Sequence, residues 1–168
     1  MVKDITYPYL PNGRKIQYVD SRNPYIEAAK NFAKSHSLDK HMPTGSVVVY
    51  DNKVIGFGAN GSEYHDEYGC ERVKRGIPTG QGYELCEGCH PKNHSEPRAI
   101  KNSRESHPDA DLSQADLYLW GHWWACEPCW NAISEAGIRN VYLMSDSHEY
   151  FNKNHPHNIV GRQFSNNV

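Results

Sequence analysis

The chain has 168 residues, a formal net charge of −2 and a mean hydropathy of −0.80. This length suits one domain with a sizeable core, and no apolar run is long enough to span a membrane. Without an overall basic excess, nucleic acid is not expected as a partner. Residues 1–10 lack the charged-then-apolar pattern of a secretory signal, so we expect a cytoplasmic protein.

The first third of the chain predicts one helix and a hairpin. Residues 1–22 contain helix-breaking prolines and a glycine and are expected to be irregular. Asn23 and Pro24 then predict the start of a helix that runs to about residue 36, because asparagine caps helices and proline suits their first turn. Residues 45–50, rich in valine, predict a buried strand, and a turn at 51–53 leads to a second strand at 54–58.

Residues 60–93 form a Cys-rich segment that also contains many glycines, prolines and charged residues. A stretch of this length without periodicity is usually disordered or functional, and its three cysteines favour a segment stapled by a metal. A helix is expected to follow, with Ser95 as its cap and Pro97 in its first turn.

The second half continues the alternation of helices and strands. Residues 115–120 predict a strand, 126–136 a helix that stops at Gly137, and 138–144 another strand. The tail after Ser145 is polar and weakly patterned, although Tyr150 and Phe151 can pack back on the core. This order of elements predicts an α/β layered domain in which helices cover a mixed sheet.

Three side chains in the second half suit one zinc ion. Cys126 and Cys129 lie three positions apart at the start of a predicted helix, so both thiols point to one side, and the helix dipole favours their thiolate forms. His94, at another helix start, completes a three-ligand set that leaves a fourth position for water, as in catalytic zinc sites. Glu96 can reach that water and move its protons without being a ligand.

The Cys126–Cys129 pair has other interpretations. A C-x-x-C motif also occurs in structural zinc knuckles and in redox pairs that follow a strand. Neither explains a His-x-Glu sequence at the start of the preceding helix, although that tripeptide alone is frequent by chance. The combination therefore favours a catalytic zinc.

The remaining cysteines suggest a second metal. Cys70, Cys86 and Cys89, with His90 next to the C-x-x-C pair, make a Cys₃His set of the kind found in closed structural zinc sites. His65 is the rival for the fourth position. The alternative is three free cysteines in a reducing compartment.

Several motifs together resemble the cytidine deaminase superfamily and, within it, the deoxycytidylate (dCMP) deaminase family. The signature of zinc nucleobase deaminases is His-x-Glu followed by Pro-Cys-x-x-Cys. The resemblance runs from about residue 43 to 144, and includes the valine strand at 42–49, the Asn-Gly turn at 56–61, the Cys-rich segment and the helix-to-strand junction at 137–142. The chain departs from the pattern at Ser95, where alanine is usual, at Ala125, where proline is usual, and in the aromatic loop at 121–124.

The resemblance implies a three-layer α/β/α cytidine deaminase-like fold with a mixed central sheet of about five strands. It implies a single domain over residues 1–168, with a Cys-rich insertion at about 60–93. The implied reaction is the zinc-dependent hydrolysis of dCMP to dUMP and ammonia, with Glu96 as the proton carrier. The implied partners are a small-molecule nucleotide and further copies of the chain, since members of this superfamily usually assemble as oligomers.

Four residues are candidate substrate contacts. Asn60 in the Asn-Gly turn can present its amide to a sugar or phosphate, although such turns also occur for conformational reasons alone. Trp123 and Trp124 can stack on a base or serve as core or oligomer contacts. Tyr150, with Ser145 and Asp146, can close the site. A basic group at Arg72, Lys74 and Arg75 can meet a phosphate or form a solvated face.

Two other functions are open from the sequence. The chain can be a deaminase of another amine-bearing nucleoside, free base, pathway intermediate or RNA base. It can also be a two-zinc binding module without catalysis, although such a module does not need Glu96.

Overall fold

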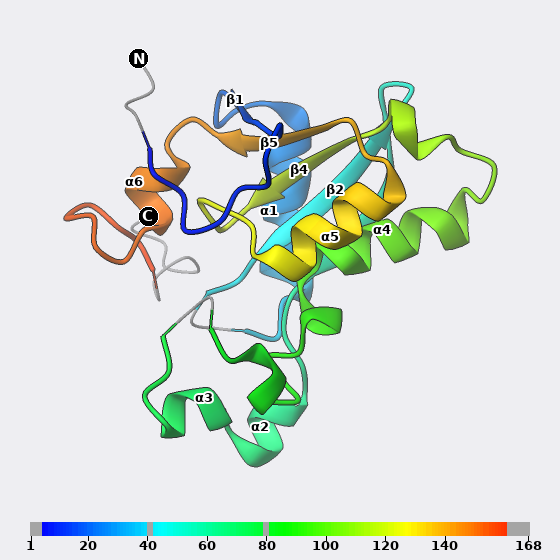
Figure 1. Ribbon diagram of the computed structural model, residues 1–168. Coiled ribbons are helices and arrows are strands. Elements are labelled where there is room, and N and C mark those ends of the chain that lie inside the picture. Colours follow the sequence, from blue (N-terminus) through cyan, green and yellow to red (C-terminus); the bar gives the residue numbers. More distant parts are fainter. Residues whose placement is uncertain (1–4, 40–41, 79–80, 161–168) are drawn as a thin grey trace.

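The computed structural model describes residues 5–39, 42–78 and 81–160 and is built around a five-stranded sheet (Figure 1). The strand order is β1-β5-β4-β2-β3. β1, β5 and β4 run parallel to one another, whereas β2 is antiparallel to both β4 and β3. The strands are β1 (Ile16–Val19), β2 (Gly45–Tyr50), β3 (Lys53–Ala59), β4 (Asp116–Trp120) and β5 (Asn140–Met144).

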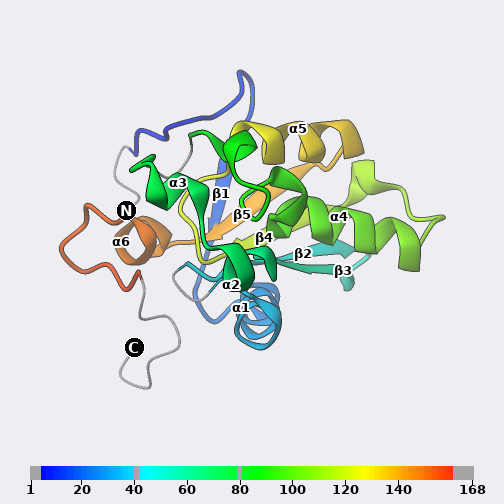
Figure 2. The same cartoon turned by 90° about the horizontal axis from the view of Figure 1, so that it is seen from below.

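Helices cover both faces of this sheet. α1 (Pro24–His36) packs on β2, β3 and β4 on one face, and α4 (Ser95–Ser106) and α5 (Glu127–Ala136) lie together on the other (Figure 2). Apolar side chains fill both interfaces, with fully buried Ala29 below the sheet and Trp130 above it. The predicted three-layer α/β/α architecture with a mixed sheet of five strands is confirmed.

Local sequence explains where these helices begin and how closely they pack. The Asn23 side chain accepts hydrogen bonds from the backbone N–H groups of Tyr25 and Ile26, and so caps α1 as predicted. Glycines on β3 let α4 approach the sheet: a Cβ on Gly58 would lie 2.2 Å from the carbonyl oxygen of Ser95. The tight α4–β3 contact fixes the start of α4, where the functional residues lie.

The expectation that residues 1–22 are irregular is wrong, because β1 pairs with β5 through residues 16–19. Only four residues long and partly exposed at the sheet edge, β1 carries too few alternating positions to reveal itself in the sequence. The tail after Ser145 also contains a short helix, α6 (Ser147–Phe151). The prediction that Phe151 packs back is confirmed, since its ring lies 5.3 Å from that of Trp120.

The Cys-rich segment contains short elements only. They are α2 (Tyr64–Tyr68), α3 (Glu71–Lys74) and the 3₁₀ turns Tyr83–Leu85 and Pro91–Asn93, and a further 3₁₀ turn, Leu112–Gln114, precedes β4. The segment projects below the layered body in Figure 1 and joins it at α4. Among the described residues, no helix is both long and apolar enough to cross a lipid bilayer.

Candidate metal centre and active site

His94, Cys126 and Cys129 converge where the N-termini of α4 and α5 meet; we call them the first cluster. His94 is the N-cap of α4, Cys126 is the N-cap of α5, and Cys129 lies in the first turn of α5. His94 Nδ1 is 3.2 Å from Cys129 Sγ and 3.5 Å from Cys126 Sγ, and the two sulfur atoms are 3.2 Å apart. Ser95 therefore begins the helix and His94 caps it, one residue earlier than expected.

These distances suit a tetrahedral metal ion. Two sulfur ligands of one zinc lie about 3.8 Å apart, and a sulfur and a nitrogen ligand about 3.5 Å apart, for ordinary zinc–ligand bond lengths. The three ligand atoms lie within 4.8 Å of one another, and neither thiol forms a disulfide. Residues of this type and spacing are compatible with zinc.

The two thiols of the first cluster share a hydrogen bond that separates their pKa values. The pKa of Cys126 is lowered to about 6, chiefly because of the hydrogen bond that it shares with Cys129, with His94 adding to the effect against the cost of burial. The pKa of Cys129 is raised well above its usual value by the same bond and by burial. These opposite shifts favour the thiolate form at Cys126 over Cys129, and the thiolate is the form that binds a metal cation.

Glu96, in the first turn of α4, is only 6% exposed. Its Oε1 accepts a hydrogen bond of 2.6 Å from the Ser95 hydroxyl. Ser95 Oγ also lies 2.8 Å from the hydroxyl of Ser46 on β2. Because the Ser95 hydroxyl donates its proton to Glu96, the Ser46 hydroxyl must donate to Ser95. The carboxylate of Glu96 is thus linked to strand β2 through two hydroxyl groups, which orient it.

A cavity of about 560 Å³ opens onto His94, Glu96 and Cys126. This volume is within the usual range for small-molecule sites. Its wall also includes two positively charged side chains, Arg72 and Lys153, together with the aromatic rings of Tyr83, His122 and Trp124.

His122 is a residue of this cavity that the sequence interpretation did not single out. Burial lowers the pKa of its imidazole to about 4, so the ring is neutral at pH 7. Its Nδ1 accepts the backbone N–H of Trp123 at 3.1 Å, which places the ring proton on Nε2. The ring also contacts Trp124 edge-on at 5.5 Å. No spacing rule identifies a lone histidine in an aromatic loop.

The candidate substrate contacts are distributed unevenly around this cavity. Trp124 and Asn60 line it, whereas Trp123 and Tyr150 are not among its lining residues. Trp123 instead packs against Tyr7 and His148, with ring distances of 6.3 and 4.8 Å. Tyr150 packs against the core cluster between α1 and the sheet.

The Asn60 side chain holds neighbouring loops together. Its Oδ1 accepts hydrogen bonds from the Ser37 hydroxyl at 2.6 Å and from the Thr44 backbone N–H at 2.9 Å. Its Nδ2 donates to the carbonyl oxygen of Met42 at 2.9 Å. Both acceptor positions of the amide oxygen are therefore occupied, and a substrate role for Asn60 stays a prediction.

His65, Cys70, Cys86 and Cys89 form a second cluster, in the Cys-rich segment, and their ligand atoms all lie within 4.8 Å of one another. His65 Nε2 is 3.3 Å from Cys86 Sγ and 3.5 Å from Cys89 Sγ, and Cys70 Sγ is 3.5 Å from Cys89 Sγ. The pKa of Cys86 is lowered to about 6, because hydrogen bonds from backbone N–H groups and His65 outweigh burial.

His65, rather than the expected His90, lies with the three cysteines in this structure. The turn after Cys89 points the His90 ring outward, where its Nδ1 accepts the Lys92 backbone N–H at 3.1 Å. Gly88 makes room for His65 instead, since a Cβ there would lie 2.4 Å from the His65 ring.

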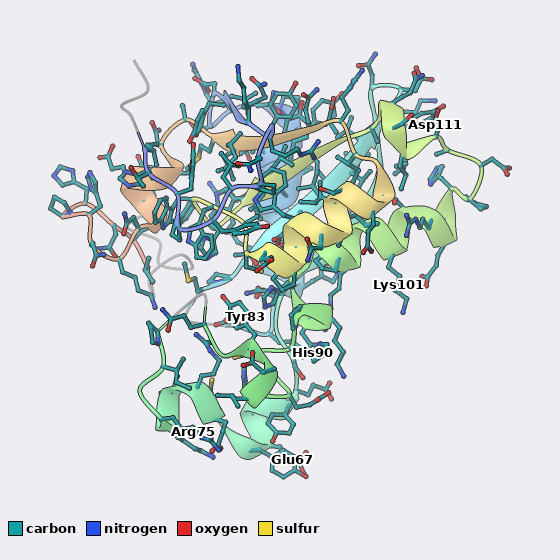
Figure 3. The ribbon with its side chains drawn as sticks, viewed as in Figure 1. Glu67, Arg75, Tyr83, His90, Lys101 and Asp111 are labelled. Atoms are coloured by element: carbon teal, nitrogen blue, oxygen red, sulfur yellow. The ribbon has the colours of Figure 1, made fainter. Side chains whose placement is uncertain are left out.

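The basic group of the Cys-rich segment is divided between the interior and the surface. Arg72 is buried, donates to the carbonyl oxygens of Gln81 and Pro78, and lies 4.6 Å above the Tyr83 ring. Arg75 bonds to Glu71 on the outside of α3. Figure 3 shows Tyr83 where the segment meets the layered body, and Arg75 at the far end of the segment.

Comparison with known structures finds several deaminases of related shape. Guanine deaminase from Bacillus subtilis matches with a TM-score of 0.46 and 18% identity, over 71% of this chain and 60% of that one. dCMP deaminase from the cyanophage S-TIM5 matches with a TM-score of 0.47 and 23% identity, over 73% and 82%.

A diaminohydroxyphosphoribosylaminopyrimidine deaminase/5-amino-6-(5-phosphoribosylamino)uracil reductase from Thermotoga maritima matches with a TM-score of 0.43 and 23% identity. That match covers 71% of this chain, which spans only 28% of the longer protein. No curated protein sequence matches the chain.

A sequence profile of one family matches residues 20–145, which include both clusters and Glu96. That family is described as the cytidine and deoxycytidylate deaminase zinc-binding region. The match covers most of the chain, and the chain therefore belongs to the cytidine and deoxycytidylate deaminase family.

Proposed function

We propose that the protein is a zinc-dependent hydrolase that converts dCMP to dUMP and ammonia. The observation that carries the proposal is the position of Glu96, a buried carboxylate beside the first cluster at the wall of one cavity. A structural metal site has no use for a carboxylate placed in this way. A cytosine base has the exocyclic amine that the chemistry of this family removes.

His94, Cys126 and Cys129 would hold the zinc ion. When bound with an open fourth position, zinc acts as a Lewis acid and makes water nucleophilic at neutral pH. Glu96 would take a proton from the attacking water and deliver it to the ring nitrogen N3. The water oxygen forms a bond to C4, the bond from C4 to the exocyclic nitrogen breaks, and Glu96 passes a second proton to the departing amine. The products are a uracil ring and ammonia.

Two cationic side chains of the cavity wall support an anionic substrate. Arg72 and Lys153 line the same cavity as the carboxylates of Asp39 and Glu96, and either cation would pair with the phosphate of a nucleotide, which an uncharged nucleoside lacks. Neutral His122 and the ring of Trp124 supply a hydrogen-bond donor and an aromatic surface for a base. Release of ammonia from dCMP, deoxycytidine, CMP, cytosine and guanine, measured side by side, would test this choice of substrate.

Glu96→Gln is the variant that tests the reaction. We expect it to keep its zinc and to lose most of its turnover, since a well-placed general acid–base contributes about 10²–10⁴-fold to rate. Glu135→Gln, which changes an exposed carboxylate on α5, is the matched control and should keep full activity. Turnover of dCMP by Glu96→Gln at the normal rate would refute the role of Glu96. Zinc binding without turnover of any compound by the wild-type protein would favour a non-catalytic module.

We also propose a second, structural zinc at the second cluster. Its sulfur–sulfur and sulfur–nitrogen separations suit one tetrahedral ion, and three cysteines with a histidine make a closed ligand set. Elemental analysis of the full-length protein should find two zinc ions per chain. One ion per chain would refute the second site and leave the proposed reaction intact.

A further inference from the structure

We propose that the second cluster positions the metal-binding histidine of the active site. The link is Cys89, whose sulfur belongs to the second cluster and whose carbonyl oxygen lies 3.1 Å from Nε2 of His94. The inference rests on the proposed function, because it assigns His94 to the catalytic zinc and a structural zinc to the second cluster.

The hydrogen bond to Cys89 determines which nitrogen of His94 can bind a metal. A carbonyl oxygen only accepts hydrogen bonds, so Nε2 must carry the ring proton. Nδ1 is then unprotonated and faces the two thiols of the first cluster. Partners of this kind fix both the tautomer and the orientation of metal-binding histidines.

Cys89 is held from its other side by the second cluster. Its sulfur lies 3.5 Å from both Cys70 Sγ and His65 Nε2, and Arg72 Nη1 donates to it at 3.4 Å. A zinc ion on this sulfur would therefore anchor the residue whose carbonyl group orients His94.

The His94 ring has further contacts to the same segment. Tyr83 meets the His94 ring edge-on at 4.8 Å, and the Arg72 guanidinium lies over the Tyr83 ring, 4.6 Å from its centre. The side chain of neighbouring Asn93 donates to the carbonyl oxygen of Glu87 at 2.9 Å, which ties the start of α4 to the turn around the C-x-x-C pair.

The Cys-rich segment has little apolar core that could hold these contacts without a metal. Among described residues 62–78 and 81–92, those that are buried are Arg72, Cys86 and Gly88. Segments that cannot bury enough apolar surface depend on metal binding for their fold. Loss of the ion from the second cluster should therefore free the Cys89 carbonyl and loosen His94.

Cys86→Ser tests this coupling, because it removes a zinc ligand of the second cluster without altering Cys89. We expect full-length Cys86→Ser to retain one zinc ion, at the first cluster. A chelator should remove this ion about 10–100-fold faster than it removes the same ion from the wild-type protein. Loss of a hydrogen-bond partner of a metal ligand typically has an effect of this size. Turnover should fall by a similar factor. With cobalt at the first cluster, the visible d–d bands should also shift.

Two further variants separate coupling from general unfolding. Gly88→Ala should displace the His65 ring and reproduce the effect of Cys86→Ser, since its Cβ would lie 2.4 Å from that ring. Leu85→Ala, a change of an exposed neighbour of Cys86, is the control and should release zinc at the wild-type rate. Circular dichroism would establish that each variant compared is folded.

Wild-type chelation rates and cobalt bands in folded Cys86→Ser and Gly88→Ala, with one zinc ion missing, would overturn the coupling. This result is distinguishable from failure of the proposed reaction. Chelation and cobalt spectra report on the metal sites whether or not dCMP is the substrate, whereas the ammonia assay on the wild-type protein tests the reaction alone.

Discussion

The hydroxyl group of Ser95 donates a hydrogen bond of 2.6 Å to Oε1 of Glu96, and both residues are buried in the first turn of α4. This bond fixes one oxygen of the proposed proton carrier. The Ser95 hydroxyl is in turn hydrogen-bonded to the hydroxyl of Ser46 on β2, so two hydroxyl groups link the carboxylate to the sheet.

Ser95→Ala should reduce kcat with little change in zinc content. A hydrogen bond to a charged group is worth about 1.5–3 kcal/mol. If this energy serves to orient Glu96 for the reaction, loss of the bond corresponds to a decrease of about tenfold or more in rate. Steady-state kinetics on the accepted substrate would measure it. Ser103 is another buried serine on α4, and its hydroxyl donates to the Ile100 carbonyl oxygen in the described structure, so Ser103→Ala should retain the wild-type rate. Equal kcat for Ser95→Ala and Ser103→Ala would exclude a functional role for the Ser95–Glu96 bond.

Gly58→Ala should destabilise the protein and disturb the first cluster. The added Cβ would lie 2.2 Å from the Ser95 carbonyl oxygen and 2.4 Å from the Ala99 nitrogen, so α4 must move away from β3. Overpacking of this kind typically costs about 1–3 kcal/mol. Thermal unfolding should show a lower Tm, and the zinc of the first cluster should be released faster. Lys53→Ala, at an exposed position of the same strand, should leave both unchanged. An unaltered Tm in Gly58→Ala would contradict the close packing of α4.

His122 should make the protein less stable as the pH falls below neutral. Its pKa is about 4 in the folded protein and about 6.5 when unperturbed, so the unfolded chain binds a proton that the folded chain does not. Stability present above pH 6.5 is then lost as the pH falls towards 4, by up to about 3 kcal/mol from this group.

Urea unfolding of the wild-type protein and His122→Gln at several pH values would measure the contribution of His122. The free energy of unfolding of the variant should decline less steeply between pH 6.5 and 4. Parallel curves for the two proteins would show that His122 is not buried in a neutral state.

Asn60→Ala should lower stability by about 1–3 kcal/mol, because the partners of its amide, two of which are buried, lose their hydrogen bonds. Those partners are the Ser37 hydroxyl, the Thr44 N–H and the Met42 carbonyl oxygen. Chemical denaturation would measure the change. If stability were unaffected while KM rose strongly, Asn60 would be a substrate contact rather than a loop anchor.

Much of the fold and of the first cluster could be predicted because the residues concerned obey local rules. Asn23-Pro24 marks a helix start, the valine run marks a strand, and two cysteines three positions apart on a helix must share a side. The strand β1 could not be predicted, since four residues at a sheet edge carry almost no periodic pattern.

The second cluster illustrates the limit of reasoning from spacing. His90 adjoins the C-x-x-C pair in sequence, but the turn after Cys89 directs its ring outward. His65 arrives from α2, and only the three-dimensional path reveals the space that Gly88 leaves for its ring. The same limit applies to His122 and to buried Arg72, whose roles depend on contacts between distant parts of the chain.

The central claim is that zinc binds between His94, Cys126 and Cys129 beside Glu96. The most direct measurement is anomalous diffraction from crystals of the full-length protein, recorded above and below the zinc absorption edge. The account predicts an anomalous peak within bonding distance of His94 Nδ1 and both sulfur atoms, present above the edge and lost below it. The absence of a peak at this position, or a disulfide between Cys126 and Cys129, would contradict the account.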